Sequence, residues 1–235
     1  MVKNLSKIYA IVPARGGSKG IKLKNLKKIN GKSLIEITSR FIDKSRIFSK
    51  KILSTDSKKI IKIGKRLNFE IVKRPKNLSG DRVSDYKVIE HCLKNLKKKD
   101  APEYIAYLQP TSPIRKINHL IAAYRTVKRK NYQSAWSVNV VNKKFHPLKT
   151  LRIKNNHLKI YLDEGKNIIA RQSLDDIYTR NGVFYIFKVS SLLKQKTIYL
   201  KKIYPSITNY PISNIDTKDD LKKAKKLMSL SFSFK

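Results

Sequence analysis

The chain has 235 residues, and its 54 Lys and Arg against 16 Asp and Glu give a formal net charge of +38. With 40% hydrophobic and 9% aromatic residues it can bury a core, which excludes a disordered polycation. No apolar run approaches the roughly 20 residues that span a bilayer, so we expect no membrane insertion. Residues 1–7 lack the apolar core of a signal peptide, and Cys92 is the only cysteine. We therefore expect a cytoplasmic globular protein without an intramolecular disulfide.

The basic surplus is typical of proteins that neutralise nucleic-acid phosphates. The lysines are spread over the whole chain, however, and form no single basic arm. Lys, Asn and Ile are all abundant, and each can be encoded by A and T alone, so an AT-rich genome would also produce this composition. We therefore favour solvated surface charge and expect no specific nucleic-acid partner. Nucleic-acid binding is kept as a distant alternative.

Strand-like and helix-like segments alternate along the first half of the chain. The apolar run at residues 8–12 predicts a strand buried on both faces of a parallel sheet. Ser33 and Glu36 form a capping-box pattern, which predicts a helix to about Ser45. Further strands are predicted at 51–54, 69–72, 104–108, 135–141 and 183–187, and further helices at 57–67, 85–96, 117–128 and 217–228. This alternation predicts an α/β fold, a three-layer α/β/α sandwich with a mostly parallel, Rossmann-like sheet.

The alternation breaks at about residues 142–181. This stretch predicts hairpin-like strands at 158–162 and 167–170, on either side of a turn at 163–165. We therefore expect a single domain over residues 1–235, with a small excursion at about 142–181.

The most informative segment is the loop at residues 14–25, directly after the first strand. Ligands of open α/β sheets bind beyond the carboxyl ends of the strands, where this loop lies. Its glycines let the backbone approach an anion, and its cations suit a triphosphate. The glycines are Gly16, Gly17 and Gly20, and the cations are Arg15, Lys19 and Lys24. The loop matches neither a P-loop nor a dinucleotide fingerprint, but we favour phosphate binding over a merely flexible basic loop.

Eight short motifs follow one another over residues 8–228. They are Ala14 to Gly20 with Lys24-Asn25, Arg74-Pro75, Ser79 to Asp81, Leu108 to Arg115, His146 to Lys149, Arg171-Gln172, Arg180 to Gly182, and Asn214 to Thr217. In this order they resemble the cytidylyltransferases that make CMP-activated sialic acids. The related CMP-Kdo synthetases are similar in fold, but their first loop lacks the Gly-Ser-Lys-Gly core.

The resemblance implies a nucleotidyltransferase with the nucleotide-diphospho-sugar transferase type of sandwich. Its reaction would join CTP and N-acylneuraminate, a nine-carbon 2-keto sugar acid, to give CMP-N-acylneuraminate and diphosphate for surface polysaccharide biosynthesis. Legionaminic acid, pseudaminic acid or Kdo could take the place of the sialic acid, because this specificity depends on pocket shape. The resemblance also implies a homodimer, in which the excursion of one subunit reaches over the sugar pocket of the other.

The resemblance also implies roles for individual residues. Arg15, Lys19 and Lys24 would bind the triphosphate and neutralise the departing pyrophosphate. The nucleotide-binding residues would be Ala14, Gly16, Gly17, Ser18, Gly20, Asn25, Arg74, Ser79 and Asp81. The sugar acid would be bound by Gln109, Lys149, Arg171 and Gln172. The cations Lys149 and Arg171 suit this acid, because the carboxylate of the acid can form a bidentate pair with an arginine.

Metal binding is the point where the chain departs from the family pattern. The family typically has Asp-Ile-Asp before the last helix, and two carboxylates suit Mg²⁺. This chain has Asn214-Ile215-Asp216, so we expect Mg²⁺, or another divalent cation such as Mn²⁺, with Asp216 as a ligand. Asn214 would coordinate through its carbonyl oxygen, or a water would replace it, or the nucleotide would carry most of the metal. The alternative role for Asp216 is at the helix N-terminus beside Thr217, where the macrodipole favours an acid.

Overall fold

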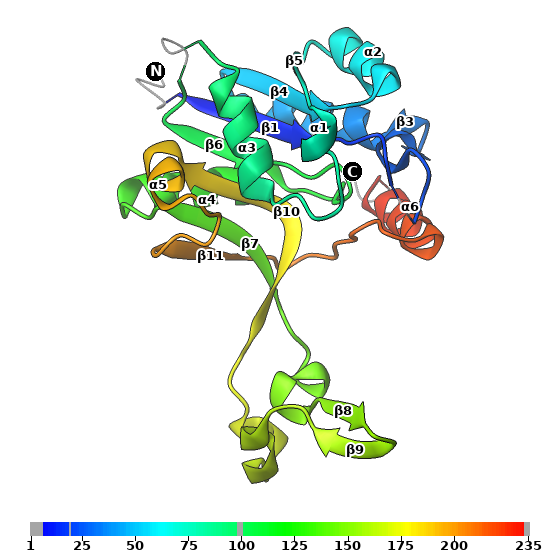
Figure 1. Ribbon diagram of the computed structural model, residues 1–235, viewed down its shortest axis with the longest axis vertical. Helices are drawn as coiled ribbons and strands as arrows, with labels where there is room; N and C mark the ends of the chain where they lie inside the picture. The colour runs from blue at the N-terminus through cyan, green and yellow to red at the C-terminus, as the bar shows by residue number, and fades with distance from the viewer. Residues whose placement is uncertain (1–6, 19, 98–100, 233–235) are drawn as a thin grey trace. The chain divides into compact units, whose positions relative to one another are not determined.

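A computed structural model describes residues 7–18, 20–97 and 101–232 of the chain (Figure 1). Within these ranges, no helix is long and apolar enough to cross a membrane. The predicted phosphate-binding residue Lys19 lies outside the described residues.

Seven strands form one sheet in the order β11-β7-β10-β6-β1-β4-β5. The strands are β1 (Ile8–Pro13), β4 (Lys50–Thr55), β5 (Glu70–Lys73), β6 (Tyr104–Tyr107), β7 (Ser134–Val140), β10 (Tyr178–Lys188) and β11 (Ile203–Ile207). β1 pairs in parallel with β4 and β6, β4 pairs in parallel with β5, and β10 is antiparallel to β6. Residues 8–12 of β1 are fully buried, as expected for a central strand covered on both faces.

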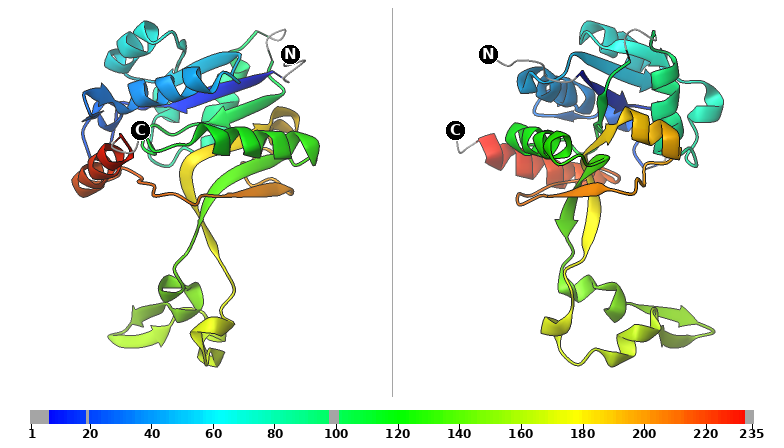
Figure 2. Two further views of the ribbon diagram at one scale, coloured as in Figure 1. Left: turned by 180° about the vertical axis from the view of Figure 1, so that it is seen from behind. Right: turned by 90° about the vertical axis from the view of Figure 1, so that its left-hand side faces the viewer.

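Helices cover both faces of this sheet. They are α1 (Leu34–Ser45), α2 (Lys58–Arg66), α3 (Asp85–Lys94), α4 (Ile117–Arg129), α5 (Val189–Gln195) and α6 (Lys218–Phe232). α1 and α4 lie on one face, and α3 and α5 lie on the other (Figure 2). The predicted capping box is present, because the Ser33 hydroxyl accepts a hydrogen bond from the Glu36 amide and the Glu36 carboxylate accepts one from the Ser33 amide. The predicted three-layer sandwich with a mostly parallel sheet is confirmed.

Among the α-helices and strands of unit 1, α5, β11 and the short antiparallel pair β2 (Lys28–Ile29) and β3 (Lys32–Ser33) were not predicted from the sequence. The turn between β2 and β3 is Asn30-Gly31, and both residues have positive φ, 46° and 76°. Asn-Gly is the strongest short-range hairpin signal, so the sequence does carry a pattern for this pair.

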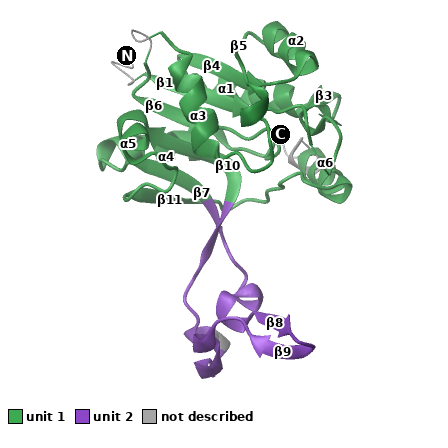
Figure 3. Cartoon of the chain, viewed as in Figure 1, with its two compact units in different colours: residues 1–137, 181–235 green, residues 138–180 purple. Residues whose placement is uncertain are grey.

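The chain divides into two compact units (Figure 3). Unit 1 comprises residues 1–137 and 181–235, and unit 2 comprises Val138–Arg180. Unit 1 contains the helices and most of the sheet. Unit 2 overlaps the stretch in which the alternation of strands and helices breaks.

The hairpin of unit 2 differs from the prediction. Its strands are β8 (Leu151–Lys154) and β9 (His157–Ile160), and the turn is Asn155-Asn156. Both Asn residues have positive φ, 50° and 61°, which a two-residue hairpin turn requires and which Asn tolerates better than most residues. The predicted strand at 158–162 overlaps β9 over residues 158–160. The predicted turn at 163–165 was wrong, because Asp163–Asn167 forms the 3₁₀-helix η6, and no strand forms at 167–170.

Candidate active site

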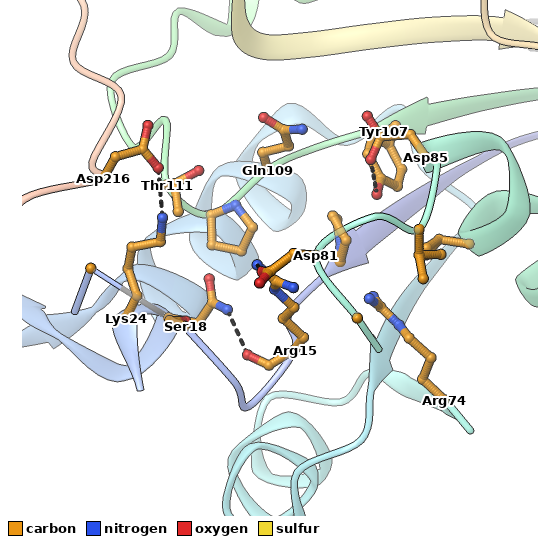
Figure 4. A pocket seen from close by; sticks show the side chains of 17 residues that line it. Arg15, Ser18, Lys24, Arg74, Asp81, Asp85, Tyr107, Gln109, Thr111 and Asp216 are labelled. Atoms are coloured by element: carbon orange, nitrogen blue, oxygen red, sulfur yellow. Dashed lines mark hydrogen bonds and ion pairs between the residues drawn. The ribbon is translucent and has the colours of Figure 1, made fainter. Parts of the chain in front are cut away.

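A cleft of about 440 Å³ lies in unit 1 where β1, β5 and β6 end (Figure 4). Pro13 ends β1, Arg74 follows β5 and Tyr107 ends β6, and all three line the cleft. Parallel strands bring their carboxyl ends to one edge of the sheet, so segments distant in the sequence meet there. Nine of the predicted site residues line the cleft: Arg15, Ser18, Gly20, Lys24, Asn25, Arg74, Asp81, Gln109 and Asp216.

The loop after β1 is attached to the end of β4. The Ala14 amide donates to the Ser54 carbonyl at 2.9 Å, and the Gly16 amide donates to Asp56 Oδ1 at 2.7 Å. A Cβ on Gly16 would lie 2.8 Å from Ser57 Cβ, so only glycine allows the loop to pack this closely. The Ala14 side chain is buried in the core. Ala14 and Gly16 therefore position the loop, and neither they nor Gly17 line the cleft.

The far end of this loop contacts the segment before α6. A Cβ on Gly20 would collide with the backbone carbonyl oxygen of Asp216. Lys24 Nζ lies 2.7 Å from Asp216 Oδ1, as Figure 4 shows. The helix cap is made instead by Thr217 and Asp220: the Thr217 amide donates to Asp220 Oδ2 at 2.8 Å, and the Asp220 amide donates to Thr217 Oγ1 at 3.2 Å. The Asp216 carboxylate makes no bond in this cap and lines the cleft, although its position just before α6 is also the one that the macrodipole favours for an acid.

A second ion pair lines the cleft. The Arg15 guanidinium pairs with the Asp81 carboxylate and lies 3.5 Å from the Ser79 carbonyl oxygen, to which it donates. The buried Asn25 side chain donates to the Arg15 carbonyl oxygen at 3.2 Å. Ser79 therefore takes part through its backbone and does not line the cleft itself. Both Arg15 and Lys24 are held by a carboxylate that a bound polyanion would have to replace.

Arg74 is anchored more deeply than the other cations. Its side chain is buried, and Nε and Nη2 donate to the hydroxyl and the carbonyl of Ser54, at 3.1 and 3.0 Å. On the floor of the cleft, the Tyr107 hydroxyl donates to Asp85 Oδ1 at 2.9 Å. Burial, reinforced by the Asp85 charge, raises the pKa of Tyr107 well above its ordinary value. The sequence reasoning missed Tyr107 and Asp85, because one belongs to a buried strand and the other opens a helix.

A polar cluster beside the cleft consists of Gln109, Ser112 and Asn214, which lie around Gly182. Ser112 Oγ donates to Asn214 Oδ1 at 2.6 Å. Gly182 has a φ of 69°, and a Cβ there would lie 2.7 Å from Gln109 Oε1 and 2.8 Å from Ser112 Oγ. Glycine is required at position 182 because of the positive φ and because a Cβ would contact both side chains too closely. Asn214 therefore lies beside the cleft, and it does not line it.

Arg115 connects this loop to the sheet. Its Nε donates to the Val183 carbonyl at 2.8 Å, Nη1 donates to Thr38 Oγ1 at 3.4 Å, and Nη2 donates to the Gln109 carbonyl. Burial lowers the pKa of Arg115 to about 9, so the guanidinium stays charged at neutral pH. Arg115 thus joins the segment that carries Gln109 to β10.

The remaining predicted residues, Lys149, Arg171 and Gln172, belong to unit 2. Lys149 lies in the 3₁₀-helix η5 (Pro147–Lys149), and Gln172 lies in η7 (Arg171–Ser173). Both side chains are exposed, and the Arg171 side chain is outside the described part. The cleft of unit 1 thus contains some of the predicted nucleotide-binding residues, namely Ser18, Gly20, Asn25, Arg74 and Asp81, together with Arg15, Lys24, Gln109 and Asp216.

The donor set of the cleft is compatible with a single hard cation. No group of three His, Cys, Asp or Glu residues gathers within the described ranges. Asp216 is an exposed carboxylate that lines the cleft next to Lys24. Mg²⁺ usually takes one or two protein carboxylates and completes its coordination with water and substrate phosphates, so Asp216 fits such an ion.

A mostly parallel sheet with a basic, glycine-rich loop at the carboxyl ends of its strands defines the class of α/β nucleotide-binding proteins. The model of the cytidylyltransferase family matches residues 9–233. The chain belongs to this family.

Curated relatives cover the chain to different extents. It is 31% identical over 198 residues to the N-acylneuraminate cytidylyltransferase of Escherichia coli. The aligned segment covers 83% of this chain and 45% of the relative. It is 28% identical over 236 residues to the pseudaminic acid cytidylyltransferase of Campylobacter jejuni, covering 98% of each. It is also 28% identical to the CMP-N,N'-diacetyllegionaminic acid synthase of Legionella pneumophila, covering 96% and 97%. The chain thus spans about half the length of the N-acylneuraminate cytidylyltransferases it matches.

The fold has close counterparts among solved structures. The CMP:2-keto-3-deoxy-manno-octonic acid synthetase complexed with CTP matches with a TM-score of 0.71, over 96% of this chain and 100% of that chain. The sequence identity is 13%, so this similarity shows the shared fold alone.

Proposed function

We propose that the chain transfers the cytidylyl group of CTP to a nonulosonic acid, with N-acylneuraminate as the first candidate and CMP-N-acylneuraminate and diphosphate as products. The observation that carries the proposal is the convergence of Arg15, Lys24 and Asp216 on one cleft at the carboxyl ends of the strands. Family membership supports the same reaction class.

The chemistry needs charge neutralisation and alignment more than a covalent catalyst. The anomeric hydroxyl oxygen of the acid attacks the α-phosphorus of CTP, its proton is lost, and the bond from the α-phosphorus to the bridging oxygen breaks as diphosphate leaves. Catalysis of such transfers is largely positioning and electrostatic stabilisation. Lys24 and Arg15 supply positive charge once the triphosphate replaces Asp216 and Asp81 as their partners. Arg74, held by Ser54, is proposed to contact the cytidine together with Asn25.

A divalent cation, Mg²⁺ or Mn²⁺, is proposed as the cofactor. Asp216 would hold it together with phosphate oxygens of the nucleotide. When bound, the ion supplies positive charge that offsets the negative charge of the triphosphate. The exposure of the Asp216 carboxylate in the cleft supports this assignment. Removing divalent cations with a chelator should abolish diphosphate release, and adding back Mg²⁺ should restore it.

A second candidate is the same reaction on pseudaminic or legionaminic acid. The observation that favours it is length, because the relatives named for these acids match this chain almost from end to end. The first candidate is supported by a slightly higher identity over a shorter share of the relative.

Diphosphate release separates these candidates. The purified chain is given CTP and Mg²⁺ with N-acetylneuraminic, legionaminic or pseudaminic acid or Kdo, one at a time. We expect release with one nine-carbon acid, at a rate well above that with Kdo. Absence of release with every acid, together with salt-sensitive binding to DNA or RNA, would favour the nucleic-acid alternative and contradict the proposal.

A homodimer formed through unit 2 is part of the proposal. In the β8–β9 hairpin, alternate side chains point to opposite faces. Leu151, Ile153 and Leu158 on one face are 51%, 75% and 66% exposed, whereas the other face carries basic side chains. Exposed apolar patches mark interaction surfaces, and a unit this small has little core of its own. These properties support association with a second copy of the chain.

A further inference from the structure

The side chain of Asn214 has a defined orientation. Ser112 is buried, and its Oγ lies 2.6 Å from Asn214 Oδ1 and 3.4 Å from the Asn181 carbonyl oxygen. A separation of 2.6 Å is typical of an O–H···O bond and shorter than N–H···O bonds usually are. The Ser112 hydroxyl therefore donates to Asn214, and the Asn214 oxygen is already engaged with the protein.

The amide nitrogen of Asn214 points away from this bond. Among the described residues, the structure gives Asn214 Nδ2 no hydrogen-bond acceptor. The next residue, Ile215, is fully buried, and its amide donates to the Thr111 carbonyl at 2.8 Å. Asn214 and Asp216, on either side of Ile215, are both exposed.

Asn214 also lies next to a residue of the cleft wall. The position that a Cβ on Gly182 would occupy is 2.7 Å from Gln109 Oε1 and 3.5 Å from Asn214 Oδ1. Gln109 lines the cleft and is the sugar-acid residue proposed in unit 1. Asn214 thus lies close to Gln109 in space and is two residues from Asp216 in the sequence.

From this geometry we infer that Asn214 is a substrate-binding residue and not a metal ligand. Its amide nitrogen donates a hydrogen bond to an oxygen of the sugar acid, either the carboxylate or a neighbouring hydroxyl. The protein then supplies one carboxylate, Asp216, to the metal. A carboxylate at position 214 could not donate this hydrogen bond and would add a second hard ligand for the cation. The inference rests on the proposed function.

Asn214→Asp tests the inference because the Ser112 hydroxyl can donate equally well to a carboxylate, so the local structure is kept. We expect the KM for the sugar acid to rise about tenfold or more, the effect of one charge-assisted hydrogen bond. The KM for CTP should change less than twofold. The affinity of the CTP-bound protein for Mn²⁺, measured by electron paramagnetic resonance without the acid, should increase.

Two further variants complete the experiment. Asn209→Asp introduces the same charge at an exposed position in the preceding segment and should change neither the acid KM nor the Mn²⁺ affinity. Ser112→Ala removes the hydroxyl that orients Asn214 and should raise the acid KM by a smaller factor than Asn214→Asp.

The outcomes separate the inference from the proposed function. If the wild type releases diphosphate with one acid and Asn214→Asp has the same KM for it, the inference is overturned and the proposed function stands. If the wild type is inactive with every acid, the proposed function fails and the inference fails with it.

Discussion

The cleft of unit 1 and unit 2 as a whole both contain predicted ligand-binding residues, but they are stabilised differently. In the cleft, Arg15, Lys24 and Arg74 are each held by partners from other segments of unit 1. In unit 2, only Val138, His146 and Leu174 are buried among the residues that the structure describes. The difference indicates that the cleft is preorganised by the sheet, whereas unit 2 has few buried residues to fix its side chains.

The largest effect is expected for Lys24→Met, which removes a cation from the cleft. Loss of one preorganised group that stabilises developing charge costs about 10²–10³ in kcat, measured by diphosphate release. The matched control is Lys22→Met, the same charge loss two residues away at an exposed position outside the cleft wall, and it should stay within about twofold of wild type. Equal effects of the two variants would contradict a preorganised cleft. Lys19→Ala, predicted from the sequence, should resemble Lys24→Met.

Arg115→Met tests whether the hydrogen bonds of Arg115 anchor the segment that carries Gln109 in unit 1. The variant keeps the apolar stem but leaves the Gln109 and Val183 carbonyl oxygens without their donor. We expect the free energy of unfolding, from urea titration, to fall by about 2–3 kcal/mol. Arg125→Met, on the exposed side of α4, should change it by less than about 0.5 kcal/mol. A stability equal to that of the control would show that Arg115 does not anchor this segment.

Ile153→Ser tests whether the apolar face of the hairpin in unit 2 forms the proposed dimer. Burial of one such side chain contributes about 1.5–3 kcal/mol, so the dissociation constant of the proposed dimer should rise by about tenfold or more. Arg152→Ser, on the basic face of the same strand, is the control and should leave the constant nearly unchanged. Sedimentation velocity over a dilution series measures both. A wild type that is monomeric and fully active would refute the role proposed for unit 2.

The smallest effect is expected for Gly20→Ala. The new Cβ would collide with the Asp216 carbonyl oxygen, so the loop must move away from the segment that carries the proposed metal ligand. We expect kcat/KM for CTP to fall about tenfold, because misplacement of binding groups weakens the positioning on which catalysis relies. Gly17→Ala serves as the control, because nothing lies within 4 Å of its Cβ. Indistinguishable kinetics of the two variants would show that the loop tolerates displacement at Gly20.

Most of unit 1 could be predicted because its signals are local. The capping box of Ser33 and Glu36 and the buried run of β1 depend on residues that are close in the sequence. The hairpin of unit 2 was misplaced because Asp163-Glu164-Gly165 resembles a turn, whereas the chain turns at Asn155-Asn156. In the structure Gly165 does not turn the chain; a Cβ there would collide with the Leu148 carbonyl oxygen.

Local patterns along the chain were sufficient for most strands and helices of unit 1 and for the loop after β1, because periodicity, capping and glycine spacing act over a few residues. The class of chemistry came from the resemblance of the motifs to a known family. They could not show which charges pair. Lys24 and Asp216 are 192 positions apart, and Ser112 and Asn214 are 102 apart. Such contacts depend on how parallel strands bring their carboxyl ends to one edge. Only folding determined that the Asn214 oxygen is engaged by a hydroxyl while the Asp216 carboxylate faces the cleft.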